Sequence, residues 1–561
     1  MTPVFQFSLV AFAWALHAPA ALAQAPARAL QAISGDSFVT NIRTLASDEF
    51  EGRGPGTAGE AKTTAFLQKE FARLGLKPGN PNGSYFQEVP VVAMRAAPQL
   101  SYQVGAKTVK LNFPDDFVAH SSRPQAELKL DKSDLVFVGY GIVAPEYGWD
   151  DYKGVDVRGK TIVMLINDPP IADPRDPSRL DQAMFKGSAM TYYGRWTYKY
   201  EIAAKMGAAA AIIVHETKPA AYPYEVVRTG GTKEQFAMMQ QGPTPSFPPV
   251  PGWIHLDRAK EMMAAGGHDF DKLKQAALSK DFRPVSLGGS ASFHIKSDNR
   301  EIKTNNVVAL IEGSDPVLKH EYVIYSAHWD HFGIDPALPG PKAKQVYHGA
   351  LDNASGTAAL IELARAFKAA PPKRSILLMA TTLEEYGLLG ARYYAMNPLY
   401  PLERTLLNIN IDNMNAWGRT AQIENVTSGH SSVDEILARH AKAQGRTTED
   451  DTRPELGSFY RADHVEFAKM GVPALYTKSR SKYVGRPDSY ARDKVDAYVA
   501  NDYHKVSDEL RGDLTFDGAL EDIALLYTVG YDVAQGAVWP QWKAGSEFKA
   551  ARDAMLKAPK R

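Results

Sequence analysis

The chain has 561 residues, and its 64 Lys and Arg residues equal its 64 Asp and Glu residues, so the formal net charge is zero. This length exceeds one ordinary domain, and the balanced charge argues against nucleic acid or an anionic membrane surface as an obligatory partner. The chain contains no cysteine, which excludes disulfides, thiol catalysis and cysteine metal ligands. Any transition metal must therefore be held by His, Asp and Glu.

The first 23 residues predict a signal peptide. An apolar stretch from Val4 to Leu16 is followed by Ala-Leu-Ala at 21–23, which suits cleavage after Ala23. The alternative, an uncleaved membrane anchor, is disfavoured because the apolar stretch is shorter than the ~20 residues that a membrane span needs. We therefore expect an exported protein, periplasmic or secreted, with no stable membrane anchor after cleavage.

The region before residue 296 divides into two parts that differ in sequence pattern. Residues 24–126 include a helical pattern at 61–76, and we expect them to begin the catalytic domain. From about Leu128, short β-rich runs alternate with Gly, Pro and Asp turns, and "RWTYKYEIAAKMGAAAAIIVHE" predicts a helix that stops at Gly207 before a buried strand. A surface segment rich in Pro, Gly and Met follows at about 220–252. We expect residues 127–295 to form a separate β-rich domain.

Residues 296–561 predict the main part of the catalytic domain. Apolar strands recur there as "NNVVALIEG", "EYVIYSAHWD", "RSILLMATTLEE", "TLLNINIDNMN" and "GVPALYT". Helical patterns lie between them, at 355–370 and 431–445. Strands that alternate with helices indicate an α/β fold, here a mixed, largely parallel central sheet flanked by helices.

Groups able to bind a metal follow several of these strands. Ligands gather beyond the carboxyl ends of strands in open α/β sheets, and the residues found there are His328, Asp330, His331, Asp352, Glu384, Glu385 and Asp412, with His504 further along the chain. Each has an ordinary alternative: Asp352 alone could cap the next helix, and the other acids could be solvated loop residues. Their occurrence together at separate strand ends favours a metal site.

The residue types suit a pair of divalent cations. Hydrolytic di-metal sites hold two ions ~3.5–4 Å apart, and a carboxylate between the ions offsets much of their repulsion. The simplest assignment makes Asp352 the bridge between two zinc ions, each completed by one imidazole and one further carboxylate: His328 with Asp412, and His504 with Glu385.

Two acids remain for other tasks. Asp330 is placed to accept the imidazole N–H of His328 and so to orient that ring. Glu384 lies beside a ligand without being needed as one, so we expect it to be the general base that takes a proton from a metal-bridging water.

At these residues the sequence resembles the co-catalytic zinc aminopeptidase family, which also includes glutamate carboxypeptidases, glutaminyl cyclases and the metal-free transferrin receptor. The matching motifs are "AHWDHFG", "GALDNASGTAAL", "TLEEYGLLGA", "NIDN", "RADHVEFAKMGVPAL" and "DYHKVSDEL", with "LASDEFEGRGPGTAGEAKTTAFL" extending the likeness to the N-terminal segment. The resemblance implies the zinc exopeptidase fold and the same roles: zinc ligands His328, Asp352, Glu385, Asp412 and His504, with Glu384 as general acid/base and Asp330 as support for His328.

The resemblance also bears on three further features. It implies that Tyr503 hydrogen-bonds the developing oxyanion, although a tyrosine before a loop histidine could simply pack. His464 in "RADHVEF" is an alternative to His504 as a ligand. Residues 127–295 resemble the protease-associated domain often inserted in these enzymes, which either packs beside the catalytic domain or walls its cleft.

The expected function is therefore that of an exported di-zinc aminopeptidase acting on peptides. Two alternatives stay open, because the ligands do not determine specificity. One is a zinc carboxypeptidase or amidohydrolase with the same site, whose choice of substrate depends on loops such as 220–252 and 478–500. The other is a binding protein that has lost its metals, which the presence of all five ligand positions and Glu384 disfavours.

Overall fold

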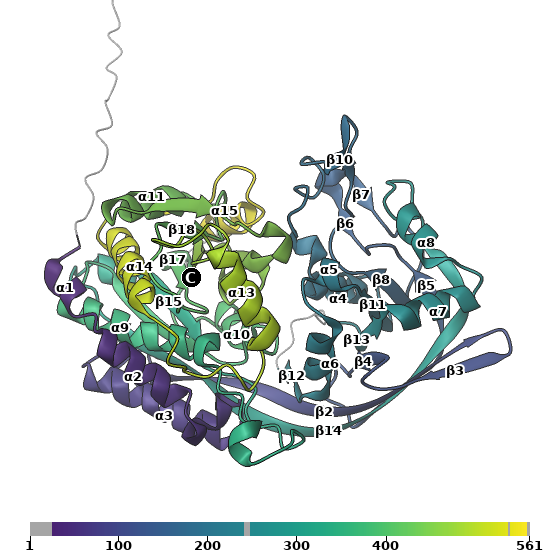
Figure 1. Ribbon diagram of the computed structural model, residues 1–561, viewed down its shortest axis with the longest axis horizontal. Helices are drawn as coiled ribbons and strands as arrows, with labels where there is room; N and C mark the ends of the chain where they lie inside the picture. Colours follow the sequence, from purple (N-terminus) through teal and green to yellow (C-terminus); the bar gives the residue numbers. More distant parts are fainter. Residues whose placement is uncertain (1–24, 240–246, 537–538, 558–561) are drawn as a thin grey trace, which may run out of the picture.

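The computed structural model describes residues 25–239, 247–536 and 539–557. The signal peptide predicted for residues 1–23 therefore lies outside the described residues. Within the described ranges, no helix has the length and apolar character needed to cross a membrane. The chain forms two lobes that lie side by side above a pair of long strands (Figure 1).

The two long strands are β2 (Phe86–Val104) and β14 (Val285–Ile311). They pair antiparallel from Phe86↔Val307 to Val104↔Gly289. At one end β14 also pairs with the sheet of the first lobe, and at the other end it pairs with the sheet of the second lobe. One hydrogen-bonded sheet therefore runs through both lobes.

The first lobe contains the predicted α/β sheet. Its strands are β1 (Lys77–Pro78), β15 (Tyr322–His328), β16 (Ser375–Thr381), β17 (Thr405–Asn410), β18 (Gln422–Asn425), β19 (Thr447–Asp450) and β20 (Ala474–Lys478). The central neighbours β20, β17, β15 and β16 are parallel, whereas β14 is antiparallel to β16 and β18 is antiparallel to β20. At the edge of the sheet, β18 and β19 are parallel. The expectation of a mixed, largely parallel sheet is confirmed.

Helices cover both faces of this sheet. They are α1 (Ala27–Gln31), α2 (Gly35–Leu45), α3 (Ala58–Arg73), α9 (Ser355–Ala369), α10 (Leu389–Met396), α11 (Val433–Ala443), α12 (His464–Lys469), α13 (Tyr490–Asn501), α14 (Asp517–Gln535) and α15 (Lys549–Lys557). Because neither face of the sheet meets water, every residue of β15, β16 and β17 is buried. The helices predicted at 61–76, 355–370 and 431–445 are confirmed as α3, α9 and α11.

The second lobe has its own sheet and its own core. Its strands are β3 (Lys107–Leu111), β4 (Phe117–Ala119), β5 (Glu127–Phe137), β6 (Val143–Ala144), β7 (Trp149–Asp150), β8 (Thr161–Leu165), β9 (Ala172–Asp173), β10 (Asp176–Leu180), β11 (Ala210–His215), β12 (Gln235–Met238) and β13 (Val250–His255). Its helices are α4 (Trp196–Lys205), α5 (Thr217–Ala220), α6 (Tyr224–Thr232), α7 (Leu256–Ala265) and α8 (Phe270–Ala276). Strands β5, β8, β11 and β13 are parallel neighbours.

The extent of the second core differs from the boundary expected at residue 127. Its buried cluster begins at Leu100 and ends at Ile295, and it includes the fully buried Phe117 of β4. The reason is that β2 passes through both lobes, so its second half and the strands after it pack against the second core. The segment at 220–252, expected to be a surface excursion, contains α6 and also β12, which pairs with β2.

The two lobes touch near the carboxyl ends of the parallel strands of the first lobe. The amide of Met190 donates to the carbonyl of Pro454 at 2.9 Å, and the ring centroids of Phe236 and Tyr386 lie 4.5 Å apart. On the same side, Lys233 Nζ lies 2.8 Å from Asp335 Oδ2. The second lobe is therefore packed against the edge where metal-binding groups were predicted.

Candidate metal centre

The strands and helices of the first lobe bring the predicted ligands to one place. His328 is the last residue of β15, Glu385 follows β16, and Asp412 follows β17. Asp352 precedes α9, and His504 follows α13. Since the carboxyl ends of parallel strands meet at one edge of the sheet, these side chains converge there.

Asp352 lies between the two histidines. Its Oδ1 is 3.3 Å from His328 Nε2, and its Oδ2 is 3.4 Å from His504 Nε2. His328 Nε2 also lies 3.6 Å from Asp412 Oδ1, and His504 Nε2 lies 3.1 Å from Glu385 Oε2. Each carboxylate oxygen of Asp352 thus faces a different histidine, which is the arrangement of a carboxylate that bridges two ions.

The donor atoms fit a metal. His328, Glu384 and Asp412 offer ligand atoms that lie within 4.8 Å of one another, as do His328, Asp352 and Glu385. His328 Nε2 is buried and has no hydrogen-bond partner among the described residues. Imidazole and carboxylate donors without thiolates suit zinc and other borderline divalent cations. The residues present therefore fit the zinc site that the sequence predicts.

The protein's own charges set Glu384 apart from the other acids. Burial works to raise the pKa of Asp352 and of Glu385, but the nearby histidines outweigh it and hold both pKa values below their usual range. Burial likewise raises the pKa of Asp412, and Lys478 and His328 reverse the effect. For Glu384, burial prevails and the neighbouring Asp412 and Glu385 add to it, so its pKa is raised well above the usual range. Glu384 is therefore the acid in this cluster best suited to hold a proton.

Asp330 contacts His328, but through a different group from the one expected. His328 Nδ1 lies 3.1 Å from the backbone carbonyl of Asp330 and 3.8 Å from its carboxylate. The carboxylate Oδ1 instead accepts the backbone N–H of Glu384 at 3.1 Å. One residue thus supports a candidate ligand with its main chain and the candidate base with its side chain.

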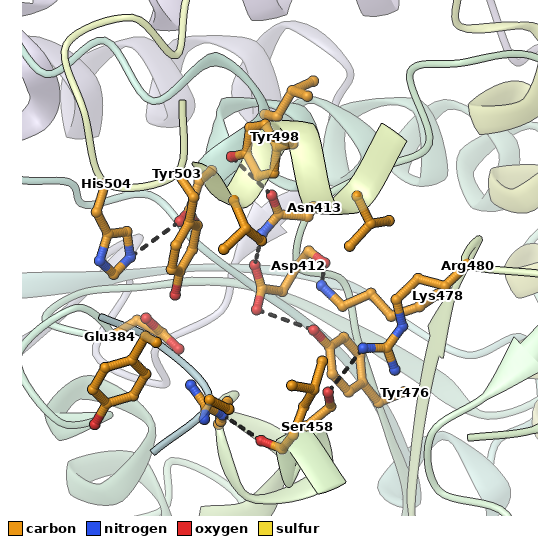
Figure 2. A pocket seen from close by; sticks show the side chains of 18 of the residues that line it. Glu384, Asp412, Asn413, Ser458, Tyr476, Lys478, Arg480, Tyr498, Tyr503 and His504 are labelled. Carbon is orange, nitrogen blue, oxygen red and sulfur yellow. Dashed lines mark hydrogen bonds and ion pairs between the residues drawn. The ribbon is translucent and has the colours of Figure 1, made fainter. Parts of the chain in front are cut away.

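Sequence reasoning missed three supports of the candidate ligands. His331 Nδ1 is hydrogen-bonded to Glu385 Oε1, although the sequence marked His331 only as a neighbour. Tyr476 donates its hydroxyl to Asp412 Oδ2 at 3.2 Å, and Lys478 donates to the backbone carbonyl of Asp412 at 2.6 Å. These two side chains lie beside Asp412 in Figure 2. They sit in "GVPALYTK", which reads as an ordinary buried strand, so no local signal distinguishes them.

Tyr503 and His464 occupy different surroundings. The ring of Tyr503 stacks on His504 with centroids 3.8 Å apart, and Figure 2 shows it beside the cavity that Glu384 and Asp412 also face. Its hydroxyl forms no hydrogen bond with the described residues. His464 is fully buried, and its ring contacts Phe459 and Tyr476, outside both ligand groups that the described residues form.

The centre opens into a cavity of about 360 Å³ between the lobes. The first lobe contributes four of the five candidate ligands, together with Glu384 and an apolar side. The four ligands are Asp352, Glu385, Asp412 and His504, and the apolar side includes Met414, Trp417, Val495 and Val499. The second lobe contributes Arg195, Trp196, Thr197, Ala221, Tyr222 and Val226. The second lobe is thus part of the wall of this cavity.

Arginines with different surroundings line this cavity. Arg480 binds Glu424 Oε1 at 2.7 Å and Asp451 Oδ1 at 3.0 Å, so its charge is neutralised. Arg195 is only 7% exposed and forms no ion pair with an acid in the described part of the chain. Burial and the nearby Arg461 lower the pKa of Arg195 to about 9. Arg461 donates to the carbonyls of Leu456 and Ala220 and likewise has no acidic partner there.

Comparison with protein families identifies the class of this domain. Residues 306–528 match the sequence model of peptidase family M28. This segment contains β15, β16, β17 and β20, all five candidate ligands and Glu384. Residues 306–528 are therefore similar to peptidase family M28.

Individual relatives match over shorter stretches. Aminopeptidase YwaD of Bacillus subtilis is 30% identical over 159 residues, which cover 28% of this chain and 31% of the relative. Aminopeptidase NAALADL1 of mouse is 29% identical over 187 residues, which cover 30% of this chain and 23% of the relative. The chain thus aligns with less than a third of the length of either protein. Among solved structures, an aminopeptidase from Aneurinibacillus sp. strain AM-1 superposes with a TM-score of 0.49 at 15% identity, covering 91% of this chain and 97% of that one.

Proposed function

We propose that the protein is a zinc-dependent exopeptidase with two ions, most simply an aminopeptidase that removes N-terminal residues from peptides. The observation that carries this proposal is the position of the Asp352 carboxylate, whose two oxygens face His328 and His504 separately. The match of residues 306–528 to family M28 and the two relatives named as aminopeptidases support the same activity.

The side chains divide the chemical work. When bound, zinc ions would polarise the scissile carbonyl and make water a stronger nucleophile at neutral pH. Glu384, which lies beside the candidate ligand Glu385 without being needed as a ligand, takes a proton from the attacking water and delivers it to the leaving amine. Tyr503 lies next to His504, and its hydroxyl has no hydrogen-bond partner among the described residues, so it is placed to donate to an oxyanion that forms in the cavity.

Metal analysis combined with peptide hydrolysis tests the proposal. Protein purified without chelator should contain two zinc ions per chain, and it should release the first residue of a short unblocked peptide. Dialysis against a chelator should abolish hydrolysis, and added zinc should restore it. Full hydrolysis by metal-free protein, or a chain that takes up no zinc, contradicts the proposal.

A second candidate is an exopeptidase that recognises a free carboxylate on the substrate. The specific observation is that Arg195 and Arg461 face the cavity without acidic partners in the described chain. Apart from the metal cluster, no acid lines the cavity in the described residues to receive a free α-ammonium group. Short peptides, with their C-terminal carboxylate close to the scissile bond, complement such a wall.

Matched substrates separate the two candidates. A free dipeptide, its C-terminal amide and its N-acetyl derivative present the same scissile bond with one end altered at a time. An aminopeptidase cleaves the free dipeptide and the amide but rejects the acetylated form. A carboxylate-dependent enzyme rejects the amide and tolerates acetylation. Rejection of both altered forms identifies a dipeptidase.

We also propose that the protein is exported to the periplasm or medium. The support is the apolar N-terminal stretch that ends in Ala-Leu-Ala at 21–23. Fractionation of expressing cells, followed by N-terminal sequencing, checks this. A cytoplasmic protein that retains residues 1–23 contradicts it.

A further inference from the structure

Arg53 is a fully buried arginine that binds only backbone carbonyls. Its guanidinium donates to Trp329 O at 2.8 Å, Leu45 O at 2.7 Å, His348 O at 2.6 Å and Gly349 O at 2.9 Å. It forms no ion pair with an acid among the described residues. Burying an arginine in this way costs free energy unless its donors are satisfied, and here these four carbonyls satisfy them.

Three of the four carbonyls, those of Trp329, His348 and Gly349, belong to the two loops that bear candidate metal ligands, and the fourth belongs to Leu45 at the end of α2. Trp329 lies between His328 and Asp330, and Gly349 begins the turn that leads to Asp352. Arg53 therefore ties the loop after β15 to the loop before α9. Because its guanidinium is planar and has five donors, a single side chain can hold both loops at once, which a lysine cannot do.

The segment that bears Arg53 is wedged between these loops. Glu51, Gly52 and Arg53 all have positive φ, at 51°, 63° and 52°. A Cβ at Gly52 would lie 2.4 Å from Gly333 O and 2.6 Å from Tyr347 O. The backbone thus adopts an uncommon conformation in a space with no room for a side chain. In this conformation the Arg53 guanidinium reaches the backbone carbonyls of the two loops that bear candidate ligands.

Asp508 holds the same loop from its other side. Its Oδ1 accepts the N–H of Leu351 and its Oδ2 accepts the N–H of Asp352, each at 3.1 Å. Its backbone carbonyl accepts the N–H of Ala350 at 3.0 Å. Residues 348–352 are therefore held through their carbonyls by Arg53 and through their N–H groups by Asp508.

The positive charge of Arg53 also complements the acidic cluster. Burial lowers the pKa of Arg53 to about 10, and Asp508, Asp352, Asp330 and Glu385 oppose this effect. Arg53 is thus a fixed positive charge near four acids that would otherwise repel one another. It offsets part of this repulsion without occupying a ligand position.

We propose that Arg53 and Asp508 are a pair of positioning residues that fix the loop 348–352 in the conformation required for metal binding. This inference rests on the metal site of the proposed function. Neither side chain coordinates the ions; each acts through the backbone that sets Asp352 between His328 and His504. The pair joins the N-terminal segment of the chain to the segment that follows His504.

Arg53→Lys tests the first member of the pair, because it keeps the charge and removes the fork of donors. Zinc affinity, measured by competition with a chromogenic chelator, should fall by about 10–100-fold, as for other residues that support metal ligands. Arg552→Lys is the matched control. Arg552 is 2% exposed and donates to Leu402 O and Thr405 O, away from the site. Its variant should bind zinc as the unaltered protein does.

Asp508→Asn tests the second member and keeps the proposal testable if Arg53→Lys does not fold. It should lower zinc affinity by a similar factor of about 10–100. Because both residues hold one loop, the double variant should lose less affinity than the product of the two single losses. Folded single variants with unchanged zinc affinity overturn the proposal, and so do losses that simply multiply. An unaltered protein that binds no zinc refutes the proposed function instead.

Discussion

Glu384 and Glu385 are adjacent in the chain but differ in their electrostatic surroundings. Glu385 contacts His331 and His504, whose imidazoles lower its pKa against the effect of burial. Glu384 lies 4.0 Å from His328 Nε2, and its pKa is raised by burial first and by neighbouring acids second. The same residue type can thus serve as a ligand at one position and as a proton carrier at the next.

Glu384→Gln should separate these two tasks. The amide cannot accept and return a proton, so we expect kcat to fall by about 10²–10⁴-fold, the usual contribution of a general acid–base group. Zinc content should stay unchanged, because Glu384 is not needed as a ligand. Activity assays and metal analysis on the same sample measure both effects. Turnover close to that of the unaltered protein rejects the assignment of Glu384 as the base.

Arg195→Met should make the protein more stable. Arg195 is buried and has no acidic partner in the described ranges, so replacing it by an apolar chain of similar length removes a burial cost. We expect this to raise the free energy of unfolding by about 1–3 kcal/mol. If Arg195 binds a substrate carboxylate, KM for a free dipeptide should rise more than KM for its amide. Urea unfolding and steady-state kinetics measure the two effects.

Arg480→Met is the control for that change. Arg480 lines the same cavity but is paired with Glu424 and Asp451, so its loss leaves the buried Glu424 and the half-buried Asp451 without their cationic partner. We expect this variant to be destabilised by about 3–5 kcal/mol, the typical result of breaking a buried ion pair. Destabilisation of both variants would show that Arg195 has a structural role.

At the scale of elements, the turn at Asp48–Arg53 helps to form the candidate metal site, together with the strands that bear the ligands. It places Gly52 against two backbone carbonyls and directs Arg53 beneath the cluster. Its length and position are set by α2 before it and α3 after it. A short irregular segment therefore connects the helical layer to the metal site.

Gly52→Ala should disturb this turn more than a substitution at another glycine with positive φ. Gly83 has φ 88° and open space where a Cβ would be added. Gly83→Ala should therefore cost only about 1–2 kcal/mol of stability, the penalty of a left-handed conformation. Gly52→Ala meets backbone oxygens as well, so we expect a larger loss of stability together with weaker zinc binding. Equal losses of stability and of zinc affinity in the two variants would contradict the close packing of Gly52 against the carbonyls of Gly333 and Tyr347.

For the whole molecule, the two lobes share one sheet and enclose one cavity. Strands β2 and β14 extend from the core of the first lobe into that of the second. The second lobe contributes Arg195, Trp196 and Tyr222 to the cavity wall. Under the proposed function, we therefore expect both lobes to take part in substrate selection, whereas the candidate metal ligands all belong to the first.

Zinc should stabilise the whole protein against heat. Binding to the folded chain alone adds about 2.7 kcal/mol to the free energy of unfolding when free zinc is 100 times its Kd. Calorimetry of chelator-treated protein, with and without added zinc, should show a higher Tm in zinc. Magnesium at the same concentration is the control, because it favours oxygen ligands over imidazole. An unchanged Tm in zinc contradicts a metal site formed by the folded state.

The sequence by itself predicted the α/β architecture and the residues of the candidate centre. Apolar runs of strand length, followed by His, Asp or Glu, identify strand ends from local pattern alone. Parallel packing then requires those ends to meet, so His328, Glu385 and Asp412 could be grouped before their distances were known. Asp352 and His504 were added because a pair of ions needs a bridging carboxylate and a second imidazole. Their roles as ligands stay a prediction, and so does the protease-associated character of residues 127–295.

Tertiary structure alone decided which groups support that centre. Arg53 reaches carbonyls 276 and 296 residues away, and Asp508 reaches the N–H of Asp352 across 156 residues. It also decided that Asp330 binds His328 by its carbonyl and that the second lobe faces the cavity. Such contacts depend on how separate elements pack, and no periodicity in the chain records that packing. The residues able to bind a metal can be recognised from the sequence around them. The residues that support these ligands, and those that enclose the cavity, are far away in the sequence and become neighbours only in the folded structure.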